Sequence, residues 1–391
     1  MNSKNSQYNW KQVIKFAGAI IAYLIGAGFA SGQETMQYFT SFGVKGALGA
    51  ALLTLILYVW FSSTIMQDGH KLKLSSSNKI FEYYCGKYLG RFYEIYTPIF
   101  LFLVFMVMIS GAGAILTEFY DFNPQVGRII MALLALFTVL SGLTQLVNIV
   151  SKIGPVIILF AILIGIANII LNPSGISQAD HVMKTIDVTK AAPTWYVSGI
   201  IFPSMGCIMI APFLSRLGVM ANSKKEAQAG GILGGLAFSL AVVILSFGIM
   251  ASISELYMKN IPTLFLTQQM FPGIGFIFSL VLFAGIYTTA VPMLWLSSNA
   301  VFTDEKSKKY IILVFVLTTI AFIGGQLPFA KLVNVLYPIS GYLGILLFAC
   351  ILIKQFKGFL KTRSYNLPGS TTLSKSLSRI ARSSDQSQTD R

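Results

Sequence analysis

The sequence contains few charged residues, cysteines and histidines for its length. Only 11% of its 391 residues are Asp, Glu, Lys or Arg, whereas soluble domains carry about 25%. The three cysteines are far apart and the two histidines do not cluster, which excludes the usual patterns of zinc, haem and iron–sulfur sites. No nucleophile–base pair or phosphate-binding loop is recognisable. We therefore expect no enzyme, no cofactor and no transition-metal site.

Apolar residues make up 55% of the chain and occur in long runs. A membrane-spanning helix needs about 20 mainly apolar residues, and by this measure the sequence predicts about ten spans. They run over residues 13–37, 43–67, 94–119, 125–143, 146–171, 196–217, 227–252, 273–301, 309–325 and 330–353. The sequence thus predicts an all-α membrane protein that crosses the lipid bilayer many times.

The net charge of +15 comes mainly from Lys and Arg residues in the predicted loops and termini. With ten spans and a cytoplasmic N-terminus, most Lys and Arg residues fall in cytoplasmic segments, as they do in membrane proteins generally. Six of the 29 lie in outer segments, namely Lys45, Arg128, Lys184, Lys190, Lys259 and Lys331. We therefore expect a cytoplasmic-membrane protein with both termini inside, and no nucleic acid as a partner.

The first span contains a stretch that is unusual for a membrane helix, from Ala22 to Glu34. It holds three glycines, a serine, a glutamine and a carboxylate. Each glycine weakens a helix by about 1 kcal/mol relative to alanine. Within a bilayer, backbone groups can open only where protein, water, an ion or a ligand satisfies them. The sequence therefore predicts that this helix is interrupted at Gly26–Gly28 and binds a solute there.

The ten spans divide into two sets of five. The fifth opens with Leu-Val-Asn at 146–148 and the tenth with Leu-Val-Asn at 332–334. A similar offset carries Gly26–Gly28 onto the middle of the sixth span, residues 202–207, where proline, serine and glycine occur together. Five spans per half invert the second half, and paired interruptions in inverted halves mark the central binding site of a transporter. We predict a 5+5 inverted repeat in which the first and sixth helices are discontinuous.

The expected organisation has five parts. It comprises a cytoplasmic N-terminus (1–12), a first repeat (13–171), an extracellular connection (172–195), a second repeat (196–353) and a basic, Ser-rich cytoplasmic tail (354–391). The tail has few apolar residues, so we predict that it is disordered. In the seventh span, Gly230 with Gly234 and Gly231 with Gly235 predict close helix packing.

A broken helix exposes amide groups where its second half begins and carbonyl groups where its first half ends. The predicted substrate-binding residues are Gly26, Ala27, Gly28, Ser204, Met205 and Gly206. The carbonyls of Ala22 and Ile25 are candidates to bind a cation. Glu34 is a candidate outer gate or a partner for a substrate amine. Alternatively, it faces lipid headgroups or pairs with a loop lysine.

Two further features are candidates for ion coupling. In the eighth span, Thr288 and Thr289 follow Gly285 closely and offer hard oxygen ligands that suit sodium. Alternatively, both hydroxyls bond back to their own helix. Lys152 lies about two turns into the fifth span and is a proton-coupling candidate, because burial favours the neutral form of a lysine. Alternatively, it reaches the cytoplasmic surface.

The whole arrangement resembles the LeuT fold of the amino acid–polyamine–organocation (APC) superfamily of transporters. Ile25 to Gly28 is similar to the glycine-rich break of their first helices, and the continuation to Glu34 most resembles the uncharacterised YkvI-type membrane proteins. The resemblance covers about residues 10–355. The sixth span departs from it, with Pro203 and Cys207 where many members have an aromatic residue after the glycine.

The resemblance implies a sodium site formed by the carbonyls of Ala22, Ile25 and Gly285 with the hydroxyls of Thr288 and Thr289. In proton-coupled members a lysine takes that place, which here is Lys152. The expected function is ion-coupled transport of a small amino acid or related zwitterion, with sodium favoured over protons. The alternative is a ligand sensor or receptor subunit on the same fold, as in spore germinant receptors.

Overall fold

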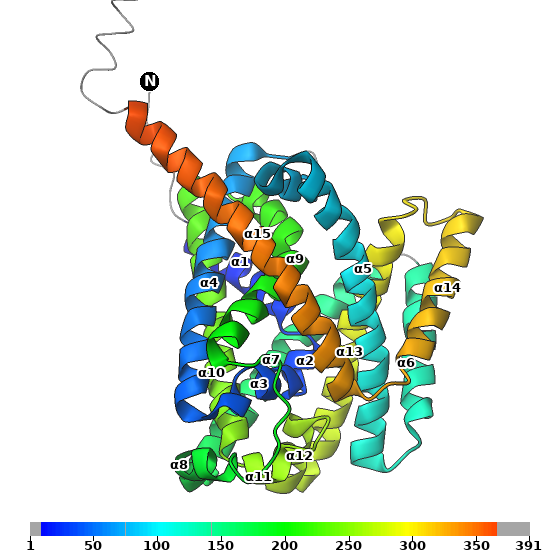
Figure 1. Cartoon of the computed structure of the whole chain (residues 1–391). Helices are drawn as coiled ribbons and strands as arrows, with labels where there is room; N and C mark the ends of the chain where they lie inside the picture. The colour runs from blue at the N-terminus through cyan, green and yellow to red at the C-terminus, as the bar shows by residue number, and fades with distance from the viewer. Residues whose placement is uncertain (1–8, 75, 142, 366–391) are drawn as a thin grey trace, which may run out of the picture. The chain divides into compact units, whose positions relative to one another are not determined.

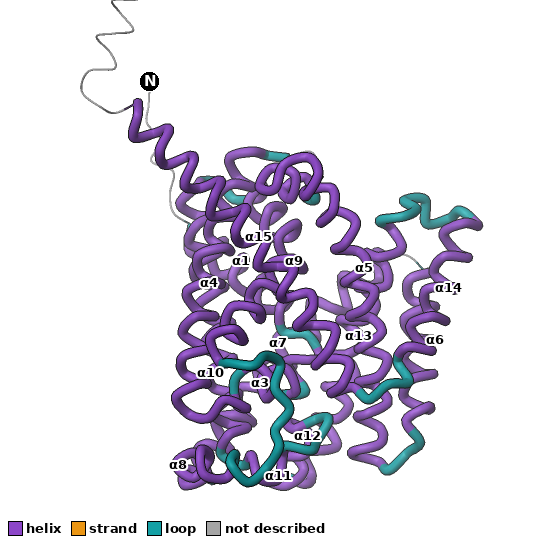
Figure 2. Tube along the Cα trace, viewed as in Figure 1, coloured by secondary structure: helices purple, strands orange, loops and turns teal. Residues whose placement is uncertain are grey.

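The computed structural model describes residues 9–74, 76–141 and 143–365, and every regular element within them is a helix (Figure 2). The α-helices of the first half are α1 (Trp10–Leu24), α2 (Ala27–Ala30), α3 (Gln33–Tyr38), α4 (Gly43–Leu72), α5 (Lys79–Tyr120), α6 (Pro124–Leu140), α7 (Leu143–Leu171) and α8 (Pro173–Val182), with the 3₁₀-helix η1 (Thr40–Phe42). Those of the second half are α9 (Trp195–Met220), α10 (Lys224–Met250), α11 (Ile253–Leu256), α12 (Pro262–Met270), α13 (Pro272–Asn299), α14 (Lys308–Gly324) and α15 (Phe329–Tyr365). The predicted all-α class is confirmed.

Each predicted span coincides with one helix, except the first, which comprises α1, α2 and α3, and not every helix is long enough to cross a bilayer by itself. Six helical stretches meet that criterion by length and composition, and the pair α7–α8, bent by 87°, adds a seventh. By contrast, α1 has 15 residues and α6 and α14 have 17 each. The chain is therefore a multi-span membrane protein, and the number ten stays a prediction.

Helix α4 packs along both α9 and α10, and glycines make this close approach possible. A Cβ atom at Gly231 would lie 2.6 Å from the backbone nitrogen of Ser63 in α4, and Gly235 is similarly close to α4. Gly230 and Gly234 face α1 instead, next to the side chains of residues 16 and 20. The predicted small-residue packing of the seventh span is thus present on two faces of α10.

The helix pairs follow the predicted inverted repeat. In that repeat α1–α3 corresponds to α9, α4 to α10 and α5 to α13. Helix α1 packs against α10, and the corresponding pair is α9 against α4. Likewise α6 packs against α13, and its counterpart α14 packs against α5. Figure 1 shows α6 and α14 side by side, beyond α5 and α13.

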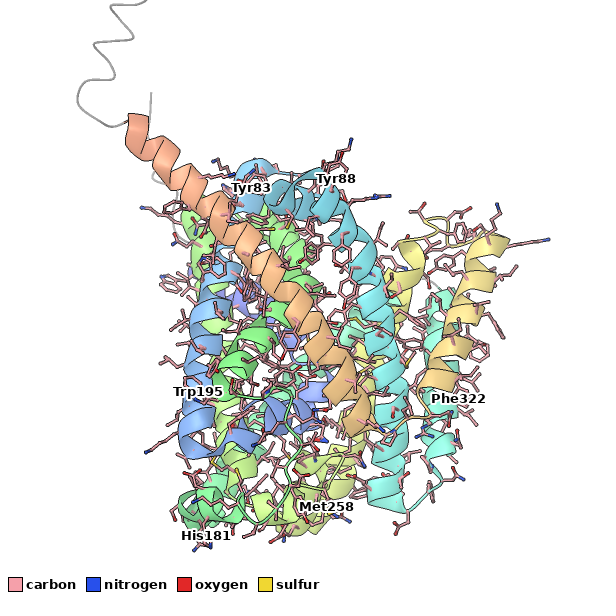
Figure 3. All side chains as sticks on the ribbon, in the orientation of Figure 1. Tyr83, Tyr88, His181, Trp195, Met258 and Phe322 are labelled. Carbon is pink, nitrogen blue, oxygen red and sulfur yellow. The ribbon has the colours of Figure 1, made fainter. Side chains whose placement is uncertain are left out.

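The two ends of the helices differ in their loops (Figure 3). Tyr83 and Tyr88 lie at the end that the charge pattern assigns to the cytoplasm, near a kink in α5 where Gly86 has φ of 71°. His181 and Met258 lie at the opposite end, with α8, α11 and α12. The connecting segments at that opposite end cover the region where the first span is interrupted, as described below.

The chain divides into two units, residues 1–347 and 348–391, and all packing described here lies within the first. Helix α15 continues to Tyr365, beyond the predicted end of the second repeat at residue 353, and the domain bounds stay a prediction. Lys354, Gln355 and Lys357 are good helix formers, so the apolar helix extends beyond its expected end. Residues 366–391 lie outside the described part of the chain.

Candidate functional site

The first span is interrupted where the sequence predicts it. Helix α1 ends at Leu24, and Ile25 leaves the helical region with φ of −83° and ψ of 81°. The four-residue helix α2 follows, and Gly32, at a φ of 82°, links it to α3. A left-handed φ of this kind favours glycine. The span therefore consists of three short helical pieces with two backbone turns between them.

Glu34 points back towards the interruption. Its carboxyl group lies against Gly28, in the space that the Cβ atom of any other residue would occupy. Ser31 supports this turn, because its hydroxyl donates a hydrogen bond to the Gly28 carbonyl at 2.8 Å. Glu34 is 9% exposed, and no described residue donates a hydrogen bond to its carboxyl group or forms an ion pair with it.

The sixth span differs from the prediction, because α9 continues without interruption through Pro203 and Gly206. Proline has no N–H group and leaves the carbonyl four residues earlier, that of Gly199, without its helical donor. The Thr54 hydroxyl of α4 donates to this carbonyl at 3.3 Å. The neighbouring helix thus supplies the hydrogen bond that proline removes, and α9 has no open amide groups at 203–206.

The predicted residues of α9 do not all face the interruption. Ser204 donates to the Ile200 carbonyl of its own helix at 2.6 Å and lies against Gly344 of α15. Met205 and Gly206 line a cavity next to the interrupted span. The Tyr58 hydroxyl of α4 lies directly over Gly206, where a Cβ atom would collide with it.

The cavity is narrow and mainly apolar, and aromatic and methionine side chains form much of its wall. About 40 Å³ of its volume is open to the centre of a water molecule, enough for a few waters at most. Its walls are formed by Tyr23, Leu24, Gly26, Gly28, Glu34, Tyr58, Val104, Met108, Phe202, Met205, Gly206, Met209, Phe238, Thr289 and Tyr337. Glu34 is the one acidic or basic side chain among these described residues. The cavity therefore joins the interrupted span to α4, α5, α9, α10, α13 and α15.

One member of the predicted sodium site lies at the interruption. A Cβ atom at Gly26 would be 3.3 Å from the Thr289 hydroxyl oxygen, so α13 contacts the break through this residue. Thr288 and Thr289 both donate to the Gly285 carbonyl, at 2.9 and 3.1 Å, which is the bonding expected of threonines in a helix. Ala22 is exposed. The five residues remain a predicted set.

The other predicted residues are only partly visible. Lys152 belongs to α7, and its side chain lies outside the described part of the structure, as does that of Ala27. Gly285 packs against Ile157 of α7, where a Cβ atom would be 2.6 Å from the Ile157 side chain. Proton coupling through Lys152 stays a prediction.

Several contacts close the cavity on the predicted outer side. Gln37 of α3 donates to the Ala330 carbonyl at 2.9 Å, and its own side-chain oxygen accepts from Asn334 at 3.1 Å. The connection after α8 crosses here, shown in teal in Figure 2. Its Ala191 donates a backbone hydrogen bond to Gln37 at 3.0 Å. Thr263 of α12 donates to the carbonyl of Ala30 at 2.6 Å.

A smaller contact closes the cavity on the predicted inner side. The ring of Tyr23, in the last turn of α1, stacks on Phe213 of α9 with centroids 4.8 Å apart. Its hydroxyl donates to the Met209 carbonyl of α9 at 3.2 Å. The interrupted span thus contributes both closures, the inner one from α1 and the outer one from α3.

Sequence reasoning missed the aromatic walls of the cavity. Tyr58, Phe202 and Phe238 come from three helices, and the ring of Tyr58 is 4.9 Å from that of Phe238 and 6.3 Å from that of Phe202. Aromatic residues are common in apolar spans, so none of them differs from ordinary core residues in the sequence.

Comparisons with known proteins support the fold. No protein-family model matches the chain. The uncharacterized protein YyaD of Bacillus subtilis is 27% identical over 346 residues, which cover 88% of this chain and 97% of YyaD. The uncharacterized membrane protein YkvI of the same organism is 23% identical over 343 residues, or 87% and 95% of the two chains. The predicted similarity to YkvI thus extends over nearly the whole of both chains.

Among solved structures, a variant of the manganese transporter of Eremococcus coleocola aligns with a TM-score of 0.57 at 12% identity. The alignment covers 90% of this chain and 80% of the transporter. A second variant gives a TM-score of 0.56 and covers 97% and 93% of the two chains. Similarity at this level shows a shared fold, and the predicted LeuT-like class is confirmed on this basis.

Proposed function

We propose that the chain is a secondary active transporter of the cytoplasmic membrane that moves a small amino acid or related zwitterion. The observation that carries this proposal is a closed cavity at an interrupted helix in the middle of an inverted repeat, which is where such transporters bind their substrates. The substrate alternates between two access routes as the halves of the fold move relative to each other. The fold shared with a manganese transporter supports the transport reading.

The two closures have the character that alternating access requires. Each consists of a few hydrogen bonds and ring contacts. A neutral hydrogen bond contributes only about 1 kcal/mol, so either closure can open at a small cost in free energy. Gln37 takes part in the outer closure and Tyr23 in the inner one. Because both residues belong to the interrupted span, a movement of α1 or α3 can open either side separately.

We also propose sodium as the coupling ion, held by the carbonyls of Ala22, Ile25 and Gly285 and the hydroxyls of Thr288 and Thr289. The position of Thr289 next to Gly26 supports this set, because the break is where free carbonyls occur. The charge of the predicted loops supports a cytoplasmic position for both termini. The substrate's carboxylate group is then expected at the amide groups that begin α2.

Reconstituted protein tests the transport function. Purified protein in liposomes is supplied with each labelled amino acid in turn, under an imposed sodium gradient and then under a pH gradient. Accumulation that collapses when the gradient is dissipated is the expected result. If ligands bind but none accumulates under either gradient, the transport function is overturned and the ligand-sensor function is favoured.

A double variant, Thr288→Ala with Thr289→Ala, tests the sodium site. The loss of two oxygen ligands is expected to raise the sodium concentration needed for half-maximal uptake by about tenfold or more, since each lost bond to a charged group costs about 1.5–3 kcal/mol. Ser298→Ala is the matched control, because Ser298 also lies on α13 and also donates to its own helix. An equal sodium requirement in both variants would overturn this assignment.

A further inference from the structure

The Glu34 carboxyl group has an unusual environment. It borders the cavity, lies against Gly28 and is 9% exposed. No described residue forms an ion pair or hydrogen bond with it. The ionisable groups that face it are tyrosines: Tyr38 of its own helix, Tyr58 of α4 and Tyr337 of α15. All of them are neutral at ordinary pH, so the described side chains that face the carboxyl group supply no compensating charge.

A carboxylate in such a place is expensive without a partner. Removing an ionised carboxylate from water costs several kcal/mol, which a nearby cation, hydrogen bonds or a bound proton must offset. The cavity that the carboxyl group borders is also lined by the rings of Tyr58, Phe202 and Phe238, which are in mutual contact. Aromatic rings attract cations, most strongly where water is excluded. The carboxyl group and the rings therefore favour the same ligand, an organic cation.

The remaining walls define the body of that ligand. Met108, Met205 and Met209 present flexible apolar side chains to the cavity, which adapt to ligands of different shape. The closed cavity holds only a few waters, so a ligand must enter while one closure is open and then displace them. Such walls suit a compact apolar group attached to a cationic one.

We propose that the cavity recognises a protonated amine, with the Glu34 carboxylate as its counter-ion and the rings of Tyr58, Phe202 and Phe238 around it. This inference rests on the proposed transport function, since it names the chemical group by which that same site selects its substrate. An amino acid satisfies it through its ammonium group, and an alkylamine without a carboxylate satisfies it as well.

Ligand series that differ by one group test the proposal. Each series contains an amino acid, the amine that lacks its carboxylate and the acid that lacks its amine. Suitable series are alanine, ethylamine and propionate; leucine, isoamylamine and 4-methylpentanoate; and phenylalanine, phenethylamine and 3-phenylpropanoate. Binding to the full-length protein in detergent is measured by thermal stabilisation and calorimetry. In at least one series the amino acid and the amine should bind, and the acid should bind at least tenfold more weakly.

Variants at Glu34 separate the charge from the shape of the side chain. Glu34→Gln keeps the shape and removes the charge, so the affinity for the binding amine should fall at least tenfold. Glu34→Asp keeps the charge and should recover part of this loss. Glu255→Gln is the matched control, because Glu255 is an exposed carboxylate away from the cavity that accepts a hydrogen bond from Gln269. It should bind like the unmodified protein.

Several outcomes would overturn the inference. Among the ligands, they are an acid that binds as well as its amine, or no binding by any amine of the three series. Among the variants, the outcome is an unchanged amine affinity in Glu34→Gln. The last is thermal stabilisation by sodium without an amine that depends on Glu34. These outcomes differ from a failure of the transport function. If amines bind but do not accumulate in liposomes, the transport function is overturned and the inference about Glu34 stands. If substrates that lack an amine accumulate, the inference is overturned and the transport function stands.

Discussion

The first and sixth spans occupy matching places in the two halves of the fold, yet only the first is interrupted. In the first, Gly26 and Gly28 lie where the backbone leaves the helix, and the Gly28 carbonyl accepts a hydrogen bond from Ser31 of the same span. In the sixth, Pro203 removes one hydrogen bond, and Thr54 of α4 supplies another to the carbonyl that is left. The comparison shows that a helix-breaking residue is not sufficient to break a membrane helix.

The difference decides what each span contributes to the site. The interrupted span provides the break between α1 and α2, the Glu34 carboxyl group and both closures. Helix α9 provides a continuous wall, with Met205 and Gly206 facing the cavity. The site is thus asymmetric although the repeat that contains it is symmetric. An inverted repeat therefore predicts where a site lies better than it predicts which half carries the chemistry.

The largest effect is expected when the first span is made to resemble the sixth. The double variant Gly26→Ala with Gly28→Ala favours a continuous helix by about 2 kcal/mol, which corresponds to about a 30-fold loss of uptake. It also places a Cβ atom against Thr289 and another where the Glu34 carboxyl group now lies. Uptake into liposomes is the measurement, with the initial rate compared at equal protein content.

Gly18→Ala is the matched control for this variant. Gly18 belongs to α1, and a Cβ atom there would meet no other residue within 4 Å. The same substitution should therefore stabilise α1 slightly and leave uptake unchanged. If Gly18→Ala lowers uptake as much as the double variant does, the interruption is not what the substrate requires.

A smaller effect is expected when α9 loses the hydrogen bond from Thr54 to the Gly199 carbonyl. Thr54→Val keeps the shape of the side chain and leaves the Gly199 carbonyl without a donor, which costs about 1 kcal/mol of stability. In a Pro203→Ala background the backbone N–H at position 203 donates to that carbonyl again, so the loss should nearly vanish. Thermal unfolding of the four proteins gives the coupling energy between the two sites. Independent effects of the two substitutions would contradict the account of α9.

Much of this fold follows from the sequence alone. The apolar runs locate every long helix, and the glycines of 26–28 locate the interruption, because both signals are local. Gly231 and Gly235 indicate close packing for the same reason. What the sequence does not show is which helix lies opposite. The bond from Thr54 to Gly199 joins residues 145 positions apart, and no local pattern announces it.

The candidate site follows from the sequence only in part. Gly28 and Glu34 lie six positions apart, and their contact is within reach of a local argument. Ser204 was expected to face the substrate, but the rotation of α9 directs it towards α15. Tyr58 and Tyr337 were not expected at all, since tyrosines on apolar helices most often contribute to the core. The direction of a side chain around a helix depends on long-range packing, which local sequence patterns do not determine.

The smallest expected effect distinguishes the two closures of the first span. Tyr23→Phe keeps the ring stacked on Phe213 and removes only the hydrogen bond to the Met209 carbonyl. A neutral bond of this kind contributes about 1 kcal/mol, so the inner closure should open a few times more often. Hydrogen exchange of the backbone amides in α1 should accelerate by about threefold to fivefold, while exchange in α3 should stay the same. Equal acceleration in α1 and α3 would mean that the two pieces move as one body, and the interruption would then not separate the inner closure from the outer one.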